Sequence, residues 1–141
     1  MYEIDILEGD ISDTHYAGDP GRDLFAQIKE PIVLSPSNRH VVISTGLRLK
    51  MPHQVFAVIM PRSGLGKKKV KIDIGIIDSD FTGKLMVSVY YLGDEEFTIN
   101  PGDRIAQLVI LPKIQVAFVK GREHVSNEFE RGSKGFGSTG Q

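Results

Sequence analysis

Short runs of alternating hydrophobic and polar residues, rich in β-branched side chains, cover most of the chain. In extended backbone successive side chains point to opposite faces, so each run is typical of a half-buried β-strand. We interpret nine runs as strands: Tyr2–Ile6, Leu24–Ile28, His40–Ser44, Val55–Met60, Val70–Ile74, Leu85–Tyr91, Phe97–Ile99, Ile105–Leu111 and Ile114–Val119. Turn residues separate them. The pattern predicts an all-β jelly roll, sandwich or barrel.

Helical periodicity is nearly absent from the chain. The best stretch is Ser63–Lys68, where Ser63 is placed to cap the first turn. We therefore expect at most one short helix.

The strand pattern stops near Ser126, and the last residues are rich in glycine, serine and threonine. Such a segment does not build a packed strand: it is either a frayed terminus or a segment ordered by something that it wraps. Its glycine-rich backbone also allows N–H groups to converge on phosphate oxygens. We predict a single β domain, residues 1–125, followed by a glycine-rich tail, residues 126–141.

Composition excludes several classes of function. The chain has 141 residues, a net charge of -1 and no cysteine, which removes disulfide frameworks and thiolate metal sites. A near-neutral charge argues against a nucleic-acid partner. The acidic start, Met1–Asp5, does not resemble a signal peptide, and no apolar run approaches membrane-spanning length. We expect a cytoplasmic protein with no membrane partner.

The stretch Gly75–Gly83 carries the most suggestive chemistry. Strand-like runs flank it on both sides, which predicts a hairpin. Asp78 and Asp80 lie two residues apart, and in extended backbone they leave by the same face. Asp78 follows two isoleucines, so we expect it to be half shielded from water and able to accept a proton. The alternative is that Asp and Gly are ordinary turn formers.

Three further stretches place polar groups beside apolar strands. In Pro61–Leu65 a strand ends where a helix begins, which is a natural anion site or an ordinary junction. Gln107 interrupts an apolar strand, so its amide is either buried with partners or faces water on an edge strand. Asp23 stands at the mouth of a strand that follows a Pro-Gly loop.

Taken in order, these stretches resemble the five signature motifs of the trimeric dUTPase family, in its bacterial and phage branch. The matching segments are Pro20–Leu24, Pro61–Leu65, Gly75–Gly83, Gly102–Gln107 and Arg131–Gly140. The resemblance implies a jelly-roll subunit, a distorted β-barrel, in a homotrimer. It also implies active sites built by neighbouring subunits and closed by the glycine-rich tail.

The reaction that the resemblance implies is hydrolysis of dUTP to dUMP and pyrophosphate, by attack of water on the α-phosphorus with Mg²⁺ as cofactor. Asp78 would orient and deprotonate the water, Asp23 would hold the metal through a water, and Gln107 would contact the α-phosphate region. Most of the binding of Mg²⁺ would come from the substrate phosphates. Such an enzyme keeps uracil out of DNA and supplies dUMP for dTMP synthesis.

The resemblance also implies a set of substrate-binding residues. Members of this set contact the phosphates, read the uracil edge through the backbone, pack under the deoxyribose or close over the nucleotide. The set is Arg62, Ser63, Gly64, Gly75, Ile76, Ile77, Phe81, Met86, Arg131, Phe136, Gly137, Ser138 and Thr139.

The chain departs from the family pattern at several positions. Phe81 replaces a tyrosine, Pro20 an alanine and Lys134 a glycine. The connector Gly66–Ile74, which helps to form the uracil pocket, is short, and we interpret its lysines as a solvated face.

Two alternative functions follow from the same fold. A dCTP deaminase would need a glutamate beside the base, where this chain offers aspartates. A non-catalytic regulator or structural subunit would not need Asp23, Asp78 or the glycine-rich tail.

Overall fold

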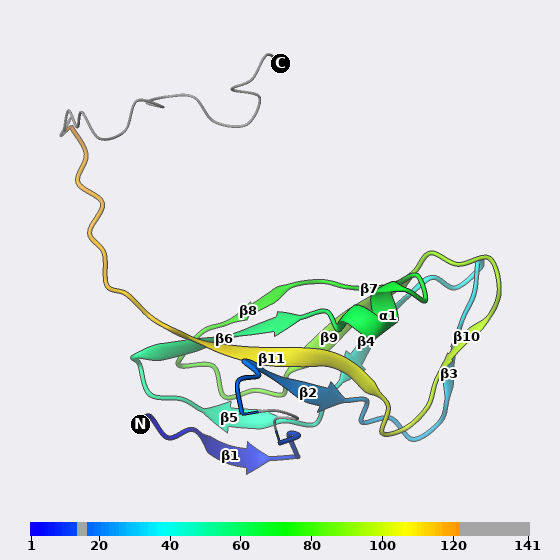
Figure 1. Cartoon of the computed structure of the whole chain (residues 1–141), viewed down its shortest axis with the longest axis horizontal. Coiled ribbons are helices and arrows are strands. Elements are labelled where there is room, and N and C mark those ends of the chain that lie inside the picture. Colours follow the sequence, from blue (N-terminus) through cyan, green and yellow to red (C-terminus); the bar gives the residue numbers. More distant parts are fainter. Residues whose placement is uncertain (14–16, 122–141) are drawn as a thin grey trace.

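Strands joined by turns and irregular segments make up residues 1–13 and 17–121, the part of the chain that the computed structural model describes (Figure 1). In chain order the strands are β1 (Asp5–Glu8), β2 (Gly21–Phe25), β3 (Ile32–Leu34), β4 (His40–Ser44), β5 (Arg48–Lys50), β6 (Val55–Met60), β7 (Val70–Ile72), β8 (Gly75–Ile77), β9 (Met86–Tyr91), β10 (Phe97–Ile99) and β11 (Arg104–Pro112). The single helix in these residues, α1, spans Ser63–Gly66. The predicted all-β fold with one short helix is confirmed.

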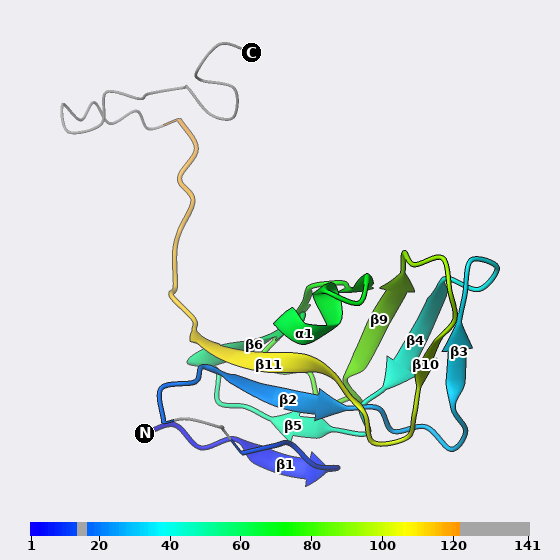
Figure 2. The same cartoon turned by 45° about the vertical axis from the view of Figure 1, so that its right-hand side comes forward.

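Two antiparallel sheets carry the core, and their strands run across one another (Figure 2). One sheet has the order β2-β11-β6-β8 and the other β4-β9-β7, while the pairs β1-β5 and β10-β3 form two-stranded ribbons. Alternation decides which side chains are buried: β9 turns Val87, Val89 and Tyr91 inward and leaves Met86 and Tyr90 exposed. The largest fully buried side chains are Leu24, Leu34, Ile43, Leu47, Leu85, Val87, Val89 and Ile99.

The predicted hairpin around Gly75–Gly83 forms, but its tip leaves its own sheet. Strands β7 and β9 pair antiparallel, with Val70 opposite Tyr91. Between them β8 crosses to the other sheet and pairs with β6. A turn follows, in which the Phe81 N–H donates to the Asp78 carbonyl at 3.1 Å. Asp78 and Asp80 therefore stand in a turn instead of the extended backbone that would set them on one face.

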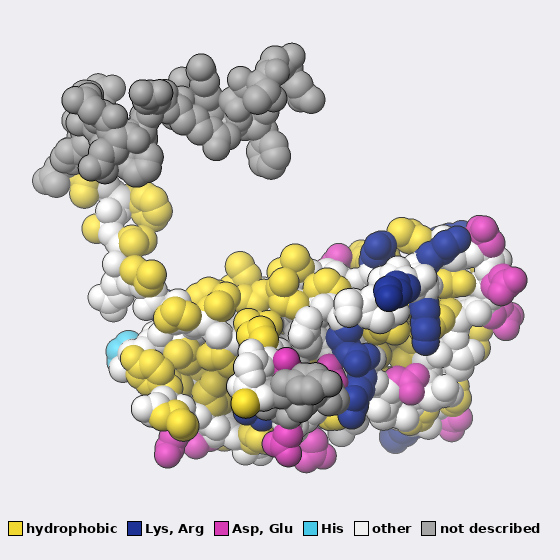
Figure 3. Space-filling model, in the orientation of Figure 1, with side chains coloured by type: hydrophobic (Ala, Val, Ile, Leu, Met, Phe, Trp, Pro, Cys, Tyr) yellow, Lys and Arg dark blue, Asp and Glu magenta, His cyan; other side chains and the backbone are white. Residues whose placement is uncertain are grey.

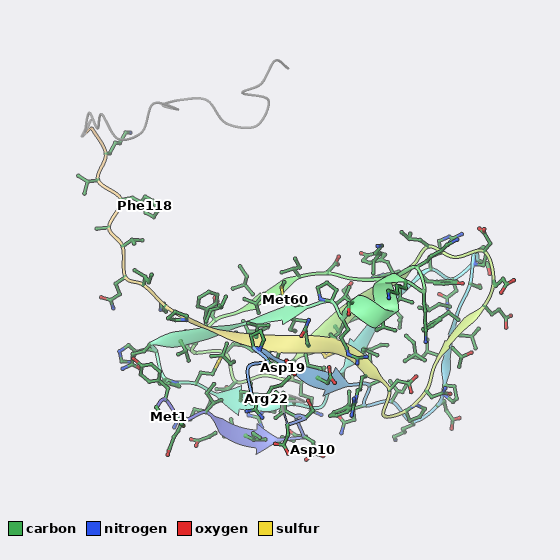
Figure 4. All side chains as sticks on the ribbon, in the orientation of Figure 1. Met1, Asp10, Asp19, Arg22, Met60 and Phe118 are labelled. Carbon is green, nitrogen blue, oxygen red and sulfur yellow. The ribbon has the colours of Figure 1, made fainter. Side chains whose placement is uncertain are left out.

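Several predicted boundaries differ from the structure. The three-residue strands β3, β5 and β8 carry too little alternation to be recognised. The predicted strand Ile114–Val119 is wrong: this segment is extended but unpaired within the described residues, and it leads away from the barrel (Figures 1 and 2). Its alternate apolar side chains are exposed, and Phe118 projects from the segment into open space (Figure 4).

The short helix also differs from its prediction. It ends at Gly66 instead of Lys68, and Arg62, in extended conformation, occupies the N-cap position without a capping side-chain hydrogen bond. Ser63 is thus the first helical residue and does not cap. Within the described ranges no helix has the length and apolar character needed to cross a membrane.

Candidate functional site

Three neighbouring strands bring the first part of the site together. Asp23 of β2 lies directly opposite Gln107 of β11, and Gln107 lies opposite Met60 of β6. Side chains at directly opposed positions share a face of the sheet and lie about 5 Å apart. Because the chain turns directly after Met60, Pro61 and Arg62 are placed beside this row.

Asp23 is buried between two arginines. Only 8% of the residue is exposed, its Oδ1 accepts a hydrogen bond from Arg62 Nε at 2.9 Å, and its Oδ2 lies 3.5 Å from an Arg104 Nη1 atom. The Asp23 backbone N–H donates to the Ser12 hydroxyl at 2.7 Å. A buried carboxylate is costly unless it is paired, so these contacts fix Asp23 and, through it, the position of the Arg62 guanidinium.

Gln107 is held by the backbone beside Arg62. Its Nε2 donates to the Pro61 carbonyl at 2.9 Å, and its side chain lies against the open face of Gly21. Strand β11 lies inside its sheet between β2 and β6, so Gln107 is not on an edge strand, and its half-buried side chain has a hydrogen-bond partner. The carbonyl oxygen of this amide lies over Gly21, and the residue also borders a cavity.

This cavity is the hollow beside the start of α1. Its volume is about 390 Å³. The lining residues are Pro61, Arg62, Ser63, Gly66, Val70, Lys71, Ile72 and Gln107. Gly64 follows Ser63 in the exposed first turn of α1. The structure therefore brings four of the predicted site residues, Asp23, Arg62, Ser63 and Gln107, into one cluster, which we call the anion pocket.

Asp78 belongs to a different hollow, which we call the aspartate pocket. Its volume is about 600 Å³ and its lining residues are His53, Phe56, Ile76, Asp78, Ser79, Asp80 and Lys113. Ser79 anchors the turn, since its hydroxyl donates to the Val55 carbonyl. Asp78 is exposed in the single chain, so the expectation that it is half shielded from water is wrong.

The anion pocket and the aspartate pocket lie at opposite ends of β6. Ile77, the residue before Asp78, pairs with Ala57 near the start of β6, whereas Arg62 follows the end of this strand. A strand advances about 3.3 Å per residue, so Asp78 and Arg62 are roughly 20 Å apart along its direction. Within one chain they do not act on the same atom.

The other predicted site residues lie either in or near β8 and β9 or outside the described residues. Gly75 and Ile77 are half-buried in β8, Ile76 and Met86 are exposed, and Phe81 follows the aspartate turn with its ring against Gly83. Some of the predicted residues lie outside the described residues: Arg131, Phe136, Gly137, Ser138 and Thr139.

The donor groups of the anion pocket suit a metal held through water. Residues 1–13 and 17–121 contain no group of three or more His, Cys, Asp or Glu side chains placed to bind a metal ion directly. Both Asp23 oxygens face arginines, and carboxylate oxygens are acceptors of the kind that hydrogen-bond to metal-bound water. Mg²⁺ usually keeps several waters and binds through one or two carboxylates together with substrate phosphates, so Asp23 fits it.

Two residues of the site were missed by sequence reasoning. Arg104 stands in the Gly102–Gln107 motif, but only the register of β2 against β11 reveals that it shares Asp23 with Arg62. An irregularity in this register between Arg104 and Ala106 sets the arginine at the strand mouth. The close approach of Gly21 to Gln107 likewise depends on strand pairing, and no local pattern signals it.

Comparison with known proteins gives concordant matches. The family model for dUTPase matches residues 8–140. The chain is 48% identical over 131 residues to a deoxyuridine 5′-triphosphate nucleotidohydrolase of Coxiella burnetii, which covers 88% of this chain and 82% of that protein. It is 41% identical to the protein of the same name in Legionella pneumophila (strain Paris), with 100% of this chain and 97% of that protein covered.

Solved structures show the same arrangement of strands. The dUTPase of Staphylococcus bacteriophage 80alpha, solved with dUpNHpp, matches with a TM-score of 0.76 and 28% identity, over 100% of this chain and 99% of that one. A variant of the 80alpha phage dUTPase matches with a TM-score of 0.78 and 27% identity, over 98% of both chains.

Proposed function

The chain belongs to the dUTPase family and hydrolyses dUTP to dUMP and pyrophosphate, and we propose that it does so in a homotrimer, with Asp78 as the base. The observation that carries this proposal is the division of the motif residues between the two ends of β6. Asp23, Arg62 and Gln107 meet in the anion pocket, while Asp78 lies in the aspartate pocket.

If a second subunit completes the site, residues from the two ends of β6 can act on the same nucleotide. The roughly 20 Å between Asp78 and Arg62 is too long for one nucleotide phosphate to contact both within one chain. In a cyclic trimer the aspartate pocket of one subunit faces the anion pocket of the next, so that three identical sites form. The tail of the third subunit, residues 126–141, would then close over each site.

The reaction that we infer is an in-line displacement at the α-phosphorus. Asp78 takes one proton from a water, whose oxygen bonds to the α-phosphorus while the bond from that phosphorus to the bridging oxygen breaks. Pyrophosphate carries the bonding electrons away. A positioned general base of this kind contributes about 10²–10⁴ in rate.

Different residues would bind the phosphates, the uracil and the deoxyribose of the nucleotide. Arg62, Ser63 and Gly64 would contact the phosphates and Gln107 the α-phosphate region. The backbone of Gly75–Ile77 and of Met86 would read the uracil edge, because a close-fitting hairpin excludes the thymine methyl and mismatches the cytosine amino group. Phe81 would pack under the deoxyribose, and its bulk would exclude a ribose 2′-hydroxyl.

The tail would complete the site. Phe136 would stack over the uracil, a contact worth about 1–3 kcal/mol in other stacked bases. Arg131, Ser138 and Thr139, with the backbone at Gly137, would donate to the γ-phosphate.

We further propose Mg²⁺ as the cofactor. When bound, the metal neutralises charge on the leaving pyrophosphate. Asp23 would hold it through a water, with Arg62 and Arg104 keeping that carboxylate in position. The place of action would be the cytoplasm, or that of the host cell for a phage gene.

The two alternative functions have less support. A dCTP deaminase needs a glutamate beside the base, and the aspartate pocket holds aspartates, a histidine and a lysine but no glutamate among its described residues. A purely non-catalytic role leaves the buried Asp23–Arg62 pair and the exposed Asp78 without a function.

The test is pyrophosphate release with Mg²⁺ from dUTP, dTTP, dCTP and UTP at equal concentrations. Turnover confined to dUTP is expected and supports the uracil and deoxyribose contacts. Turnover spread over several nucleotides would keep the phosphate chemistry and overturn the base specificity. No turnover of any of the four would overturn the proposal in favour of a non-catalytic protein.

A further inference from the structure

The lysines between residues 67 and 71 are all exposed, but they border two different hollows. Lysine and arginine side chains gather over and beside α1 (Figure 3). Lys67 lines a hollow of about 320 Å³ that also contains Asp94 and Glu95. Lys71 instead lines the anion pocket. All four lysines are exposed, as a solvated face requires, and Lys71 in addition borders the anion pocket.

The fold places Lys71 by strand pairing. After α1 the chain makes a tight turn that ends at Lys69, whose φ of 62° is in the left-handed region. The chain then enters β7, which buries Val70 and Ile72 and leaves Lys71 on the open face opposite Tyr90. Because β7 is the outer strand of its sheet, its free edge borders the anion pocket.

The charge of Lys71 is not neutralised within the described residues. No carboxylate is among the described residues that line the hollow beside α1, and Asp23, the carboxylate of the anion pocket, faces Arg62 and Arg104. Arg62, the other cation of the pocket, is paired with Asp23 at 2.9 Å. The Lys71 side chain forms no hydrogen bond or ion pair with residues 1–13 or 17–121. A hollow lined by an ammonium group that has no carboxylate partner attracts anions.

We propose that Lys71 is a further substrate-binding residue, which contacts the triphosphate of the nucleotide and the pyrophosphate that is released. The inference rests on the proposed function, because the same pocket contains the phosphate-contacting residues Arg62, Ser63 and Gln107. A lysine suits this role because its four-carbon stem is flexible, so its three N–H donors can hydrogen-bond to phosphate oxygens in more than one position. The short connector of this chain thus supplies a phosphate contact.

The experiment compares the full-length protein with Lys71→Met, which keeps the apolar stem and removes the charge. Binding of pyrophosphate and of dUpNHpp is measured by calorimetry, and KM and kcat for dUTP are measured with Mg²⁺. Both dissociation constants and KM are expected to rise about tenfold, as for loss of one charged hydrogen bond. The change in kcat should be much smaller, because the contact is made before and during reaction alike.

Two further variants make the result specific. Lys67→Met removes the same charge from the same connector but outside the anion pocket, and it should leave all these constants near those of the unchanged protein. Lys71→Arg should restore pyrophosphate binding. The inference is overturned if Lys71→Met binds pyrophosphate normally, or if Lys67→Met weakens it equally. Since pyrophosphate binding needs no turnover, an inactive unchanged protein would overturn the proposed function and still leave Lys71 open to this test.

Discussion

The side chain of Gln107 occupies the space beside Gly21 in which any other residue would place its Cβ. Cross-strand pairing brings the two together, because β2 and β11 run side by side with Gly21 opposite Val109 and Asp23 opposite Gln107. The absence of a side chain at Gly21 therefore leaves Gln107 free to donate to the Pro61 carbonyl at 2.9 Å.

Gly21→Ala should reduce catalysis without unfolding the protein. The added methyl meets the far end of a flexible glutamine, which moves away and loses its contact with Pro61. We expect kcat/KM for dUTP to fall about tenfold, equivalent to about 1.4 kcal/mol of transition-state stabilisation. The free energy of unfolding should change by less than about 1 kcal/mol. Steady-state kinetics and urea unfolding measure the two quantities.

The matched control is Gly18→Ala, because a Cβ at Gly18 has no neighbouring atom within 4 Å. This variant should keep the activity of the unchanged protein. If Gly21→Ala is as active as Gly18→Ala, Gln107 does not act from the position that the structure gives it.

Phe81 provides a test of sugar discrimination. Its ring lies against Gly83 at the end of the aspartate turn, where an added Cβ would come within 2.7 Å of Phe81 Cζ. Phe81→Ala should lower the preference for dUTP over UTP, because exclusion of the ribose hydroxyl by a ring is steric. Phe81→Tyr keeps the ring and should keep the preference. The measurement is kcat/KM for both nucleotides, and an unchanged preference in Phe81→Ala would place sugar discrimination elsewhere.

Removal of residues 131–141 should separate assembly from catalysis. If the tail closes over a site formed by other subunits, the shortened protein should remain a trimer with unchanged thermal stability and lose nearly all dUTP turnover. Light scattering and pyrophosphate release are the measurements. Removal of Gln141 alone, which lies beyond the matched motif, should be harmless. A monomeric product of the larger deletion would show that the tail holds the subunits together.

Alternation predicts long strands well because each face of such a strand has a fixed environment. The strands His40–Ser44 and Val55–Met60 match to the residue, and so does one of the three-residue strands, Phe97–Ile99. The same rule fails at Ile114–Val119, where the pattern of a strand is present but the described chain offers no partner strand. A residue pattern shows which faces of a segment are apolar, but it does not show which other segment packs against those faces.

The sequence likewise identified some residues of the candidate site and missed others. Motifs identified Asp23, Arg62 and Gln107, which the structure brings together. Arg104 escaped notice because its contact with Asp23 depends on strand register, and the position of Lys71 at the anion pocket depends on strand pairing in the same way. Sequence reasoning also expected Asp78 to be half shielded, a property that a single chain does not supply.

Mixed trimers test whether sites are shared between subunits. Asp78→Asn should abolish most turnover while leaving the fold and the binding of dUpNHpp intact, and Gln107→Leu should also be nearly inactive. Because the two residues stand at opposite ends of β6, a site can draw Asp78 from one subunit and Gln107 from another. When the two variants are co-expressed and assemble at random, about a quarter of the sites should contain both native residues.

Turnover of the co-expressed variants should therefore reach about a quarter of that of the unchanged protein. Separately purified variants mixed without subunit exchange are the control and should remain inactive. The matched variant Asp80→Asn, from the same pocket as Asp78, should retain turnover, since only Asp78 is proposed to act as the base. No recovery in co-expressed trimers of confirmed mixed composition would mean that each site takes both residues from one chain, and the shared-site proposal would be wrong.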